Sequence, residues 1–184
     1  MWILIADDEL LIRMGLKSML EEMGHQAIAV ANGREALRQA SRQQFDLAIL
    51  DIRMPYTDGL QTAEALNRQQ SIPILMLTAY SDEELVERAS DLPIQGYLVK
   101  PIEPAELGAA IKVAVKRHQE SEALKSQAAA YQQKLKAQRI INQAKARLMA
   151  TGLSEQDAHR AIQKRARDSQ RPMIQVAQEI LSDN

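Results

Sequence analysis

The stretch Ile3-Leu4-Ile5-Ala6-Asp7-Asp8 decides the fold, because a continuous apolar run ends directly in two carboxylates. Continuous apolar runs are typical of strands that are covered on both faces, as in parallel sheets. Four more such runs follow at intervals of about 20–27 residues: Ala27–Ala31, Leu47–Leu50, Ile74–Leu77 and Tyr97–Val99. Helix-like segments separate the runs, so the sequence predicts right-handed βαβ units and a doubly wound α/β domain with a five-stranded parallel sheet.

The segments between the runs carry apolar residues at helical spacing. They are Leu11, Met14, Met19 and Met23 in the first segment, and Ala36, Leu37 and Ala40 in the second. Residues 81–84 form a capping box, with Ser81 as the N-cap and Glu84 at position N3, which predicts the start of another helix.

Polar residues follow four of the five runs: Asp7 and Asp8, Asp51, Thr78 and Lys100. Ligands of open α/β sheets bind at the carboxyl ends of the strands, so we expect these side chains to converge. Carboxylates brought together repel one another, and Mg²⁺, a hard cation that prefers oxygen ligands, relieves that repulsion. Taken singly, such acids often only cap the following helix; the full set predicts a phosphoryl-handling site.

In such a site Asp51 acts as a carboxylate nucleophile and forms an aspartyl phosphate. Mg²⁺ and Lys100 neutralise charge on the transferred group, while the Thr78 hydroxyl donates to a phosphoryl oxygen.

These segments resemble the receiver domain of two-component response regulators over about residues 1–118. The matching strings are Ile3–Glu9, Leu47–Pro55, Leu75–Ala79 and Tyr97–Pro101. The resemblance implies the flavodoxin-like strand order 2-1-3-4-5 and a cis Lys100–Pro101 peptide. It also implies that a sensor histidine kinase donates its phosphoryl group to Asp51.

The same resemblance assigns further roles. Asp8, Asp51 and the backbone carbonyl of Arg53 hold Mg²⁺, and Asp7 contacts the ion through water. Thr78 and Tyr97 match the family's switch pair, although core packing of Tyr97 is a competing interpretation. Arg53 and Tyr80 occupy the positions that tune dephosphorylation, and their bulk predicts a long phosphorylated lifetime.

Composition separates the front of the chain from the back. Residues 1–118 carry 12 Lys and Arg against 17 Asp and Glu, whereas residues 134–171 carry 10 against 3. An acidic front and a basic back indicate two roles, the second involving a polyanion. Cysteine is absent, no apolar run approaches the ~20 residues that span a bilayer, and the N-terminus turns acidic after six residues. We therefore expect a soluble cytoplasmic protein without membrane partners.

From Ala105 to about Ala150 the chain has no proline, which predicts one long helix. A heptad frame places seven apolar residues at ten a and d positions: Leu107, Ala110, Ala114, Leu124, Ala128, Tyr131 and Leu135, with Arg117, Ser121 and Gln138 as exceptions. The frame favours a dimerising coiled coil, with a solvated helix as the alternative.

Two more helices are expected after a break at Thr151–Leu153. Residues Ser154–Asp157 read as a cap with early acids, and Pro172 suits the first position of the last helix. Arg160, Lys164 and Arg167 share one face of the middle helix, Lys145 lies on the preceding helix and Arg171 opens the last. A solvated basic face is the ordinary explanation of such a run.

Residues 140–181 resemble an ANTAR domain, the three-helix output module of transcription antiterminators. The matching positions include Ile141, Ala144, Lys145, Leu148, Gly152, Ala158, Ile162, Ala166, Val176 and Ala177. The resemblance implies binding of RNA with paired hairpins, whose splayed loop bases are readable while the A-form stem is not. This sequence departs from the family at His159, where an aromatic residue is common, and at Gln163, where arginine is usual.

The sequence therefore predicts a receiver at 1–118, a helical linker at 119–137 and an RNA-binding domain at 138–184. The expected protein is a non-enzymatic, phosphorylation-controlled antiterminator that dimerises when phosphorylated. Lys145, Arg160, Lys164, Arg167 and Arg171 are the candidate RNA contacts. A DNA-binding regulator and a phosphorelay or partner-docking protein are the alternatives.

Overall fold

The computed structural model describes residues 1–55, 58–79 and 92–182. The chain divides into two compact units, Met1–Glu122 and Ala123–Asn184. The domain limits expected from the sequence, 1–118, 119–137 and 138–184, stay predictions. The capping box at 81–84 and Tyr80 lie outside the described residues.

The first unit is built on a five-stranded parallel sheet. Its strands are β1 (Trp2–Ala6), β2 (Gln26–Val30), β3 (Leu47–Asp51), β4 (Ile74–Thr78) and β5 (Gly96–Val99). Their order is β2-β1-β3-β4-β5, and all four pairings are parallel. The expected fold class and strand order are confirmed.

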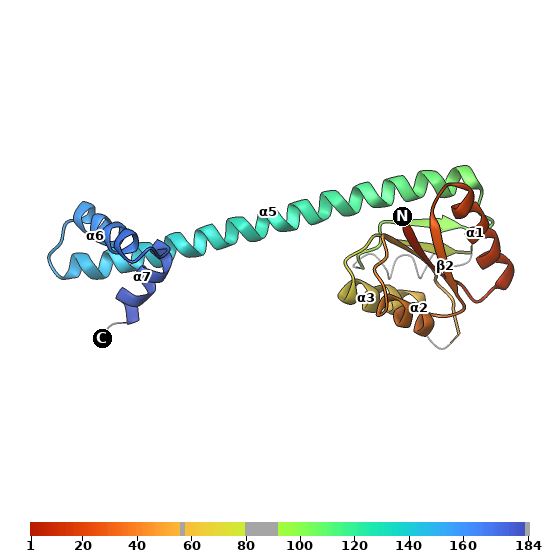
Figure 1. Ribbon diagram of the computed structural model, residues 1–184, viewed down its shortest axis with the longest axis horizontal. Coiled ribbons are helices and arrows are strands. Elements are labelled where there is room, and N and C mark those ends of the chain that lie inside the picture. The colour runs from red at the N-terminus through yellow and green to blue at the C-terminus, as the bar shows by residue number, and fades with distance from the viewer. Residues whose placement is uncertain (56–57, 80–91, 183–184) are drawn as a thin grey trace. The chain divides into compact units, whose positions relative to one another are not determined.

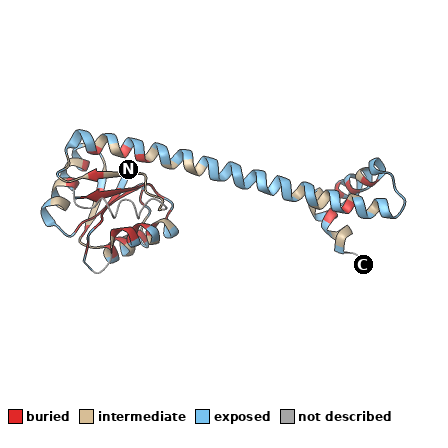
Figure 2. Cartoon of the chain, turned by 180° about the vertical axis from the view of Figure 1, so that it is seen from behind, coloured by how far each residue is buried: buried red, intermediate tan, exposed pale blue. Residues whose placement is uncertain are grey.

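Helices cover both faces of this sheet (Figure 1). The residues of each strand alternate between two cores, because successive side chains of a strand point to opposite faces. Leu4 and Leu50 pack with α2 (Gly33–Ala40) and α3 (Gly59–Gln69), whereas Ile5 and Ile49 pack with α1 (Leu10–Glu22) and the start of α5. Figure 2 shows the buried strands between these layers.

The prediction of which residues form the buried face of α1 is wrong in part. Leu16 and Leu20 are its buried residues, while the side chains of Leu11 and Met14 are 83% and 61% exposed. The buried side of α1 is the one that meets the sheet, and Leu11 and Met14 lie on a neighbouring side that contacts solvent. In α2 the expected Ala36 and Ala40 are buried.

The long helix α5 runs from Pro104 to Ala150, as the proline-free stretch predicts. Its heptad positions lie in different environments. Leu107 and Ala114 are fully buried in the core of the first unit, whereas Leu124 is 66% and Leu135 is 56% exposed. The early part of the seam is thus used within the receiver fold, and only the later part is free to pair with a second helix.

The second unit packs the end of α5 against α6 (Glu155–Asp168) and α7 (Met173–Ser182). Its buried core consists of Ala144, Ile162, Ala166, Val176 and Ala177. The expected break and both tail helices are confirmed. Small alanines at the centre let three short helices approach closely.

Local chemistry defines the turn between α5 and α6. Gly152 has a φ of +98°, a conformation that glycine adopts without steric cost. The Ser154 hydroxyl then accepts a hydrogen bond of 3.1 Å from the backbone N–H of Asp157, so it is the N-cap of α6. Among the described helices, none is both long enough and apolar enough to cross a membrane.

Candidate functional site

The polar residues singled out from the sequence meet at the carboxyl edge of the sheet. Asp7 directly follows β1, Asp51 and Thr78 are the last residues of β3 and β4, and Lys100 directly follows β5. The parallel register places Asp51 beside Leu77, and Thr78 beside Val99. Parallel pairing therefore assembles, at one edge, side chains that are far apart in the sequence.

The Lys100 side chain joins the two buried carboxylates. Its Nζ lies 2.7 Å from Oδ2 of Asp7 and 2.8 Å from Oδ1 of Asp51. A third, more exposed carboxylate, that of Glu9, lies 3.2 Å from the same ammonium. Asp7 is fully buried and Asp51 is 5% exposed, so a single cation balances two carboxylates that are shielded from water.

Burial and charge shift two pKa values in this cluster. Burial raises the pKa of the Asp51 carboxyl from 3.8 to about 6; the hydrogen bond and charge of Lys100 oppose that rise, and the charge of Asp7 adds to it. Burial lowers the pKa of the Lys100 ammonium, but hydrogen bonds and charge from Asp51 and Asp7 outweigh burial and raise it. At neutral pH the pair is thus an ionised carboxylate beside a firmly protonated lysine.

The acidic loop after β1 is held by a residue that the sequence reasoning missed. Nη1 of Arg13 donates to the backbone carbonyls of Asp7 and Asp8, at 2.7 and 2.9 Å. The backbone N–H of Glu9 donates to Oδ1 of Asp7 at 2.8 Å. An arginine early in a helix gives no distinct sequence signal, because its target is a pair of main-chain oxygens.

The end of β3 leaves no room for a side chain on the neighbouring helix. A Cβ on Gly59, the first residue of α3, would lie 1.9 Å from the backbone oxygen of Asp51. The N–H of Gly59 donates to the carbonyl of Ile52 at 2.9 Å, and the Asp58 side chain caps the helix by accepting from Leu60. Glycine therefore lets α3 begin in contact with the backbone of Asp51.

The two residues assigned to the switch pair lie on adjacent strands. The Thr78 side chain is buried, and its hydroxyl donates to the carbonyl of Ala79 at 2.9 Å. Tyr97 is half-buried against the α2–α3 side of the core, and burial raises the pKa of its phenol. The Lys100–Pro101 peptide is cis, as the resemblance implies.

The residues expected to hold Mg²⁺ offer oxygen donors at the carboxyl edge of the sheet. Among the described residues, no three acidic, histidine or cysteine side chains form a ready-made metal cluster. Mg²⁺ often needs only one or two carboxylates, since it keeps several waters and takes phosphate oxygens. Oδ2 of Asp7 is buried and lies 2.7 Å from Nζ of Lys100, and Asp8 and Arg53 border a hollow of about 450 Å³. The backbone N–H of Arg53 donates to Oδ2 of Asp51 at 2.9 Å, which holds Arg53 beside the Asp51 carboxylate. Carboxylates and a backbone carbonyl are oxygen donors of the kind that Mg²⁺ takes, so the donor set fits.

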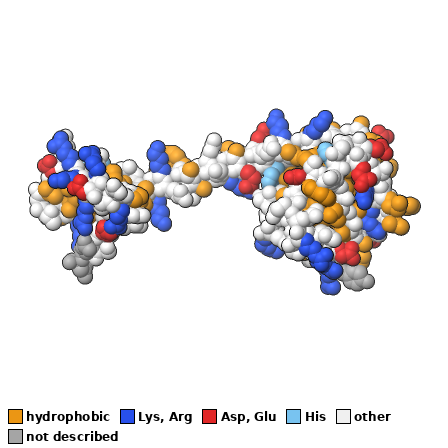
Figure 3. All heavy atoms as spheres, viewed as in Figure 1, with side chains coloured by type: hydrophobic (Ala, Val, Ile, Leu, Met, Phe, Trp, Pro, Cys, Tyr) orange, Lys and Arg blue, Asp and Glu red, His pale blue; other side chains and the backbone are white. Residues whose placement is uncertain are grey.

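The basic residues of the second unit fall into two groups. Nζ of Lys145 lies 2.6 Å from Oε1 of Glu155, and the Arg171 guanidinium forms an ion pair with the Glu179 carboxylate. The pairing lowers the pKa of Glu155. The other candidates form an exposed face of α6, opposite its buried residues: Arg160, Lys164 and Arg167. Of these, Arg160 also has an acidic partner, since its Nη1 lies 3.9 Å from Oδ1 of Asp157. Figure 3 shows Lys and Arg side chains over the second unit.

Two family models match the chain. The response regulator receiver domain matches residues 3–112, and the ANTAR domain matches residues 129–181. The first match covers the sheet and the carboxylate–lysine cluster. The second covers the end of α5 together with α6 and α7.

Known proteins resemble the chain over both parts or over the first alone. The transcriptional regulatory protein PdtaR of Mycobacterium tuberculosis is 39% identical over 181 residues, which is 97% of this chain and 88% of that protein. The regulatory protein PhoP of Bacillus subtilis is 36% identical over 116 residues, 62% of this chain and 48% of that protein. The crystallised chemotaxis protein CheY4 of Vibrio cholerae superposes with a TM-score of 0.58 at 32% identity, covering 61% of this chain and 97% of that chain.

The match to PdtaR spans nearly all of both chains, and it includes the aspartate-bearing sheet as well as the three-helix tail. The chain therefore belongs to the response regulators that join a receiver domain to an antiterminator-type ANTAR output domain.

Proposed function

We propose that Asp51 accepts a phosphoryl group from a sensor histidine kinase, and that this event controls RNA binding by the second unit in transcription antitermination. The observation that carries the proposal is the position of Lys100, within 2.8 Å of Asp51 and 2.7 Å of Asp7 at the sheet edge. The proposed protein acts in the cytoplasm and catalyses nothing beyond its own phosphorylation and dephosphorylation.

In the transfer step, a carboxylate oxygen of Asp51 attacks the phosphorus of a phosphohistidine. The new O–P bond forms as the P–N bond breaks, and the electron pair of that bond leaves with the imidazole nitrogen. The Lys100 ammonium neutralises charge on the phosphoryl oxygens. Asp7, Asp8, Asp51 and the backbone carbonyl of Arg53 would hold Mg²⁺, whose charge also neutralises these oxygens when it is bound.

Phosphorylation then changes the contacts of residues on the neighbouring strands β4 and β5. The Thr78 hydroxyl exchanges its present acceptor, the carbonyl of Ala79, for a phosphoryl oxygen. The Tyr97 ring, which is only half-buried, then moves inward against the core. This change shifts the receiver between two states and biases it toward dimerisation.

The exposed later part of the α5 seam, with Leu124 and Tyr131, is the proposed dimer contact. A dimer presents two ANTAR units to RNA with two hairpins. The second contact then forms at the effective concentration set by the first, so two weak sites bind as one stronger site. Lys164 and Arg167 supply phosphate contacts, while Lys145, Arg160 and Arg171 must first exchange their carboxylate partners.

The test measures phosphorylation and RNA binding separately. Incubation with acetyl phosphate and Mg²⁺ should phosphorylate the wild-type chain but not Asp51→Asn, which keeps the shape and loses the nucleophile. Two-hairpin RNA should bind more tightly with a beryllofluoride–Mg²⁺ phosphoryl mimic, and Asp51→Ala should abolish this gain. Lys145→Ala reports whether that cation contacts RNA. Equal affinity for duplex DNA, or no RNA binding in either state, would contradict the proposed output.

A further inference from the structure

The end of the long helix carries an unusual charge distribution. Residues 123–154 contain six Lys and Arg and no Asp or Glu. On a helix, a basic residue can form an ion pair with an acid one turn away, at i,i+4. Such pairs occur earlier in α5, between Lys116 and Glu120. The later stretch contains no acid of its own, so cations of this stretch that have no partner elsewhere are available to a polyanion.

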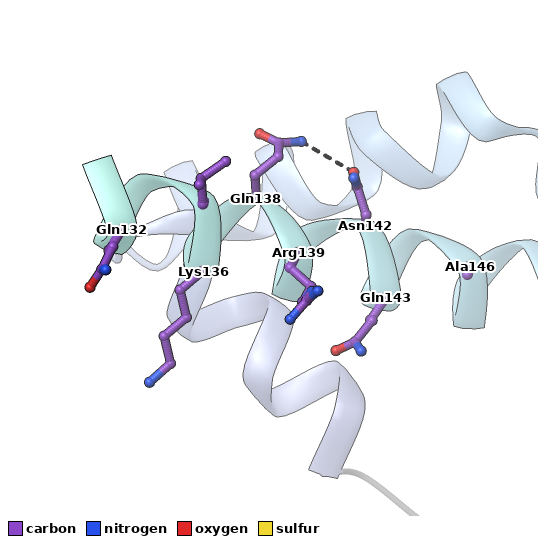
Figure 4. A pocket seen from close by; sticks show the side chains of 8 residues that line it. Gln132, Lys136, Gln138, Arg139, Asn142, Gln143 and Ala146 are labelled. Carbon is purple, nitrogen blue, oxygen red and sulfur yellow. Dashed lines mark hydrogen bonds between the residues drawn. The ribbon is translucent and has the colours of Figure 1, made fainter. Parts of the chain in front are cut away.

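This stretch borders a hollow of about 770 Å³, and the last apolar position of the heptad seam, Leu135, is among the residues that line it. Its walls come from α5 alone: Gln132, Leu135, Lys136, Gln138, Arg139, Asn142, Gln143 and Ala146. In Figure 4, Lys136, Arg139 and Gln143 project from one side of the helix, and Gln138 and Asn142 project from the other. Gln138 donates to Asn142 at 3.1 Å. Six of the eight side chains therefore offer amides or cations.

The two cations of the hollow differ from other cations of the same unit. Neither Lys136 nor Arg139 has an ion pair or hydrogen bond with any described residue, whereas Lys145 and Arg171 each have a carboxylate partner. An unpaired cation does not lose a protein contact when a phosphate arrives. Lys136 and Arg139 are thus better placed to bind a polyanion than Lys145 and Arg171 are.

On the side away from the hollow, this part of α5 packs against the three-helix core. Ala144 is fully buried in the three-helix core, and Ile140, Ile141 and Leu148 pack partly buried against that core. These residues lie on the opposite face of the helical turns that carry Arg139 and Gln143. Because the buried face immobilises these turns, the exposed cation and amide are presented in a defined geometry.

We infer that this hollow, which we name the amide–cation groove, is where the ANTAR unit receives an RNA hairpin loop. Lys136 and Arg139 bind phosphates, and the Gln143 amide hydrogen-bonds to the edge of an unpaired base. Amide side chains carry both donors and acceptors, as recognition of splayed loop bases requires. This inference rests on the proposed function and adds Gln132, Lys136, Arg139 and Gln143 to its site.

The charge of the groove disfavours a second copy of this helix as its occupant. A parallel helix in register would bring a second Lys136 and a second Arg139 to the same place. No acid between residues 123 and 154 offsets that repulsion. The exposed apolar seam positions also end at Leu135, and the next position is Gln138. Charge complementarity therefore favours RNA.

The test uses the full chain with the beryllofluoride–Mg²⁺ mimic. A pool of two-hairpin RNAs with randomised loops is enriched on the wild-type protein, and the enriched RNA is the probe. The variants are Lys136→Gln, Arg139→Gln and Gln143→Ala. Lys134→Gln is the matched control, because it removes an exposed, unpaired cation roughly 200° around the helix from Lys136.

We expect Arg139→Gln to weaken binding by about 5-fold to 150-fold and Lys136→Gln to lower the slope of log affinity against log salt by about 1. Gln143→Ala should reduce discrimination among loop sequences, and Lys134→Gln should change affinity less than twofold. Groove variants that bind like Lys134→Gln would overturn the groove while leaving RNA binding intact.

Two other results would also overturn the inference. Failure to enrich any RNA on the wild-type chain would remove the proposed function together with the groove. A groove variant that changes the sedimentation coefficient without RNA would identify the groove as a contact between copies. Circular dichroism of each variant verifies that the helices are intact.

Discussion

Replacing Gly59 with alanine should damage the fold and the phosphoacceptor site together. The added Cβ would lie 1.9 Å from the backbone oxygen of Asp51, 2.9 Å from its carbonyl carbon and 3.0 Å from Cα of Ile52. All three are main-chain atoms at or directly after the end of β3, which carries the nucleophile, so no flexible side chain can move aside. Carbon–oxygen contacts begin at about 3.3 Å, so the helix and strand must separate by roughly 1.4 Å.

The free energy of unfolding should fall by a corresponding amount. Overpacking of this kind costs about 1–3 kcal/mol, and loss of the Gly59 N–H to Ile52 hydrogen bond costs about 1 kcal/mol more. For a unit of this size each kcal/mol lowers Tm by about 4 °C, so we expect a decrease of about 8–16 °C. Because a misplacement of about 1 Å can cost a hundredfold in rate, phosphorylation should slow by about 10-fold to 100-fold.

The assay is thermal unfolding followed by circular dichroism, together with the rate of phosphorylation by acetyl phosphate. Gly15→Ala is the matched control, since Gly15 lies within α1 and a Cβ there meets nothing within 4 Å. Alanine should stabilise that helix by about 0.5–1 kcal/mol. A Tm for Gly59→Ala within about 2 °C of the wild type would refute the steric reasoning, as would equal destabilisation by both substitutions.

Three further outcomes are expected. In the metal-free protein the Asp51 carboxyl should titrate near its pKa of about 6 in ¹³C NMR, and a pKa below 4.5 would contradict the burial argument. Since this pKa is raised above 3.8, the contribution of Asp51 to folding stability is fully present below about pH 4 and is lost as pH rises through 6. Ser154→Ala should destabilise the second unit by about 1 kcal/mol in urea unfolding, whereas Ser154→Asn should restore the cap. Lys145→Met, which keeps the chain length and removes the ion pair with exposed Glu155, should leave the midpoint of urea unfolding unchanged, because solvent screens exposed ion pairs.

The strands were the most predictable part of the fold. Each expected run agrees with its strand to within one residue at either end, because a doubly covered strand needs apolar residues at every position. The first helix was less predictable. Leu11 and Met14 have helical spacing, but a one-sided helix buries only the side that meets the sheet, and that side is chosen by packing.

The candidate site, too, could be predicted from the sequence only in part. Asp51 and Lys100 were recognisable because chemistry-bearing side chains directly follow apolar strands. The roles of Arg13 and Gly59 were not, since both act on main-chain oxygens of residues brought near by the fold. In the tail, a count of charges cannot separate Lys145, which is paired, from Lys136, which is not.

By itself the sequence determined the parallel α/β fold, the position of the acidic and basic residues at its strand ends, and the helical tail with its glycine break. These features depend on local patterning, which is written in consecutive residues. Only the tertiary structure decided which cations are neutralised, where α5 changes from core to exposed surface, and how closely α3 approaches Asp51. Those properties depend on distances between residues far apart in the chain, which packing alone sets.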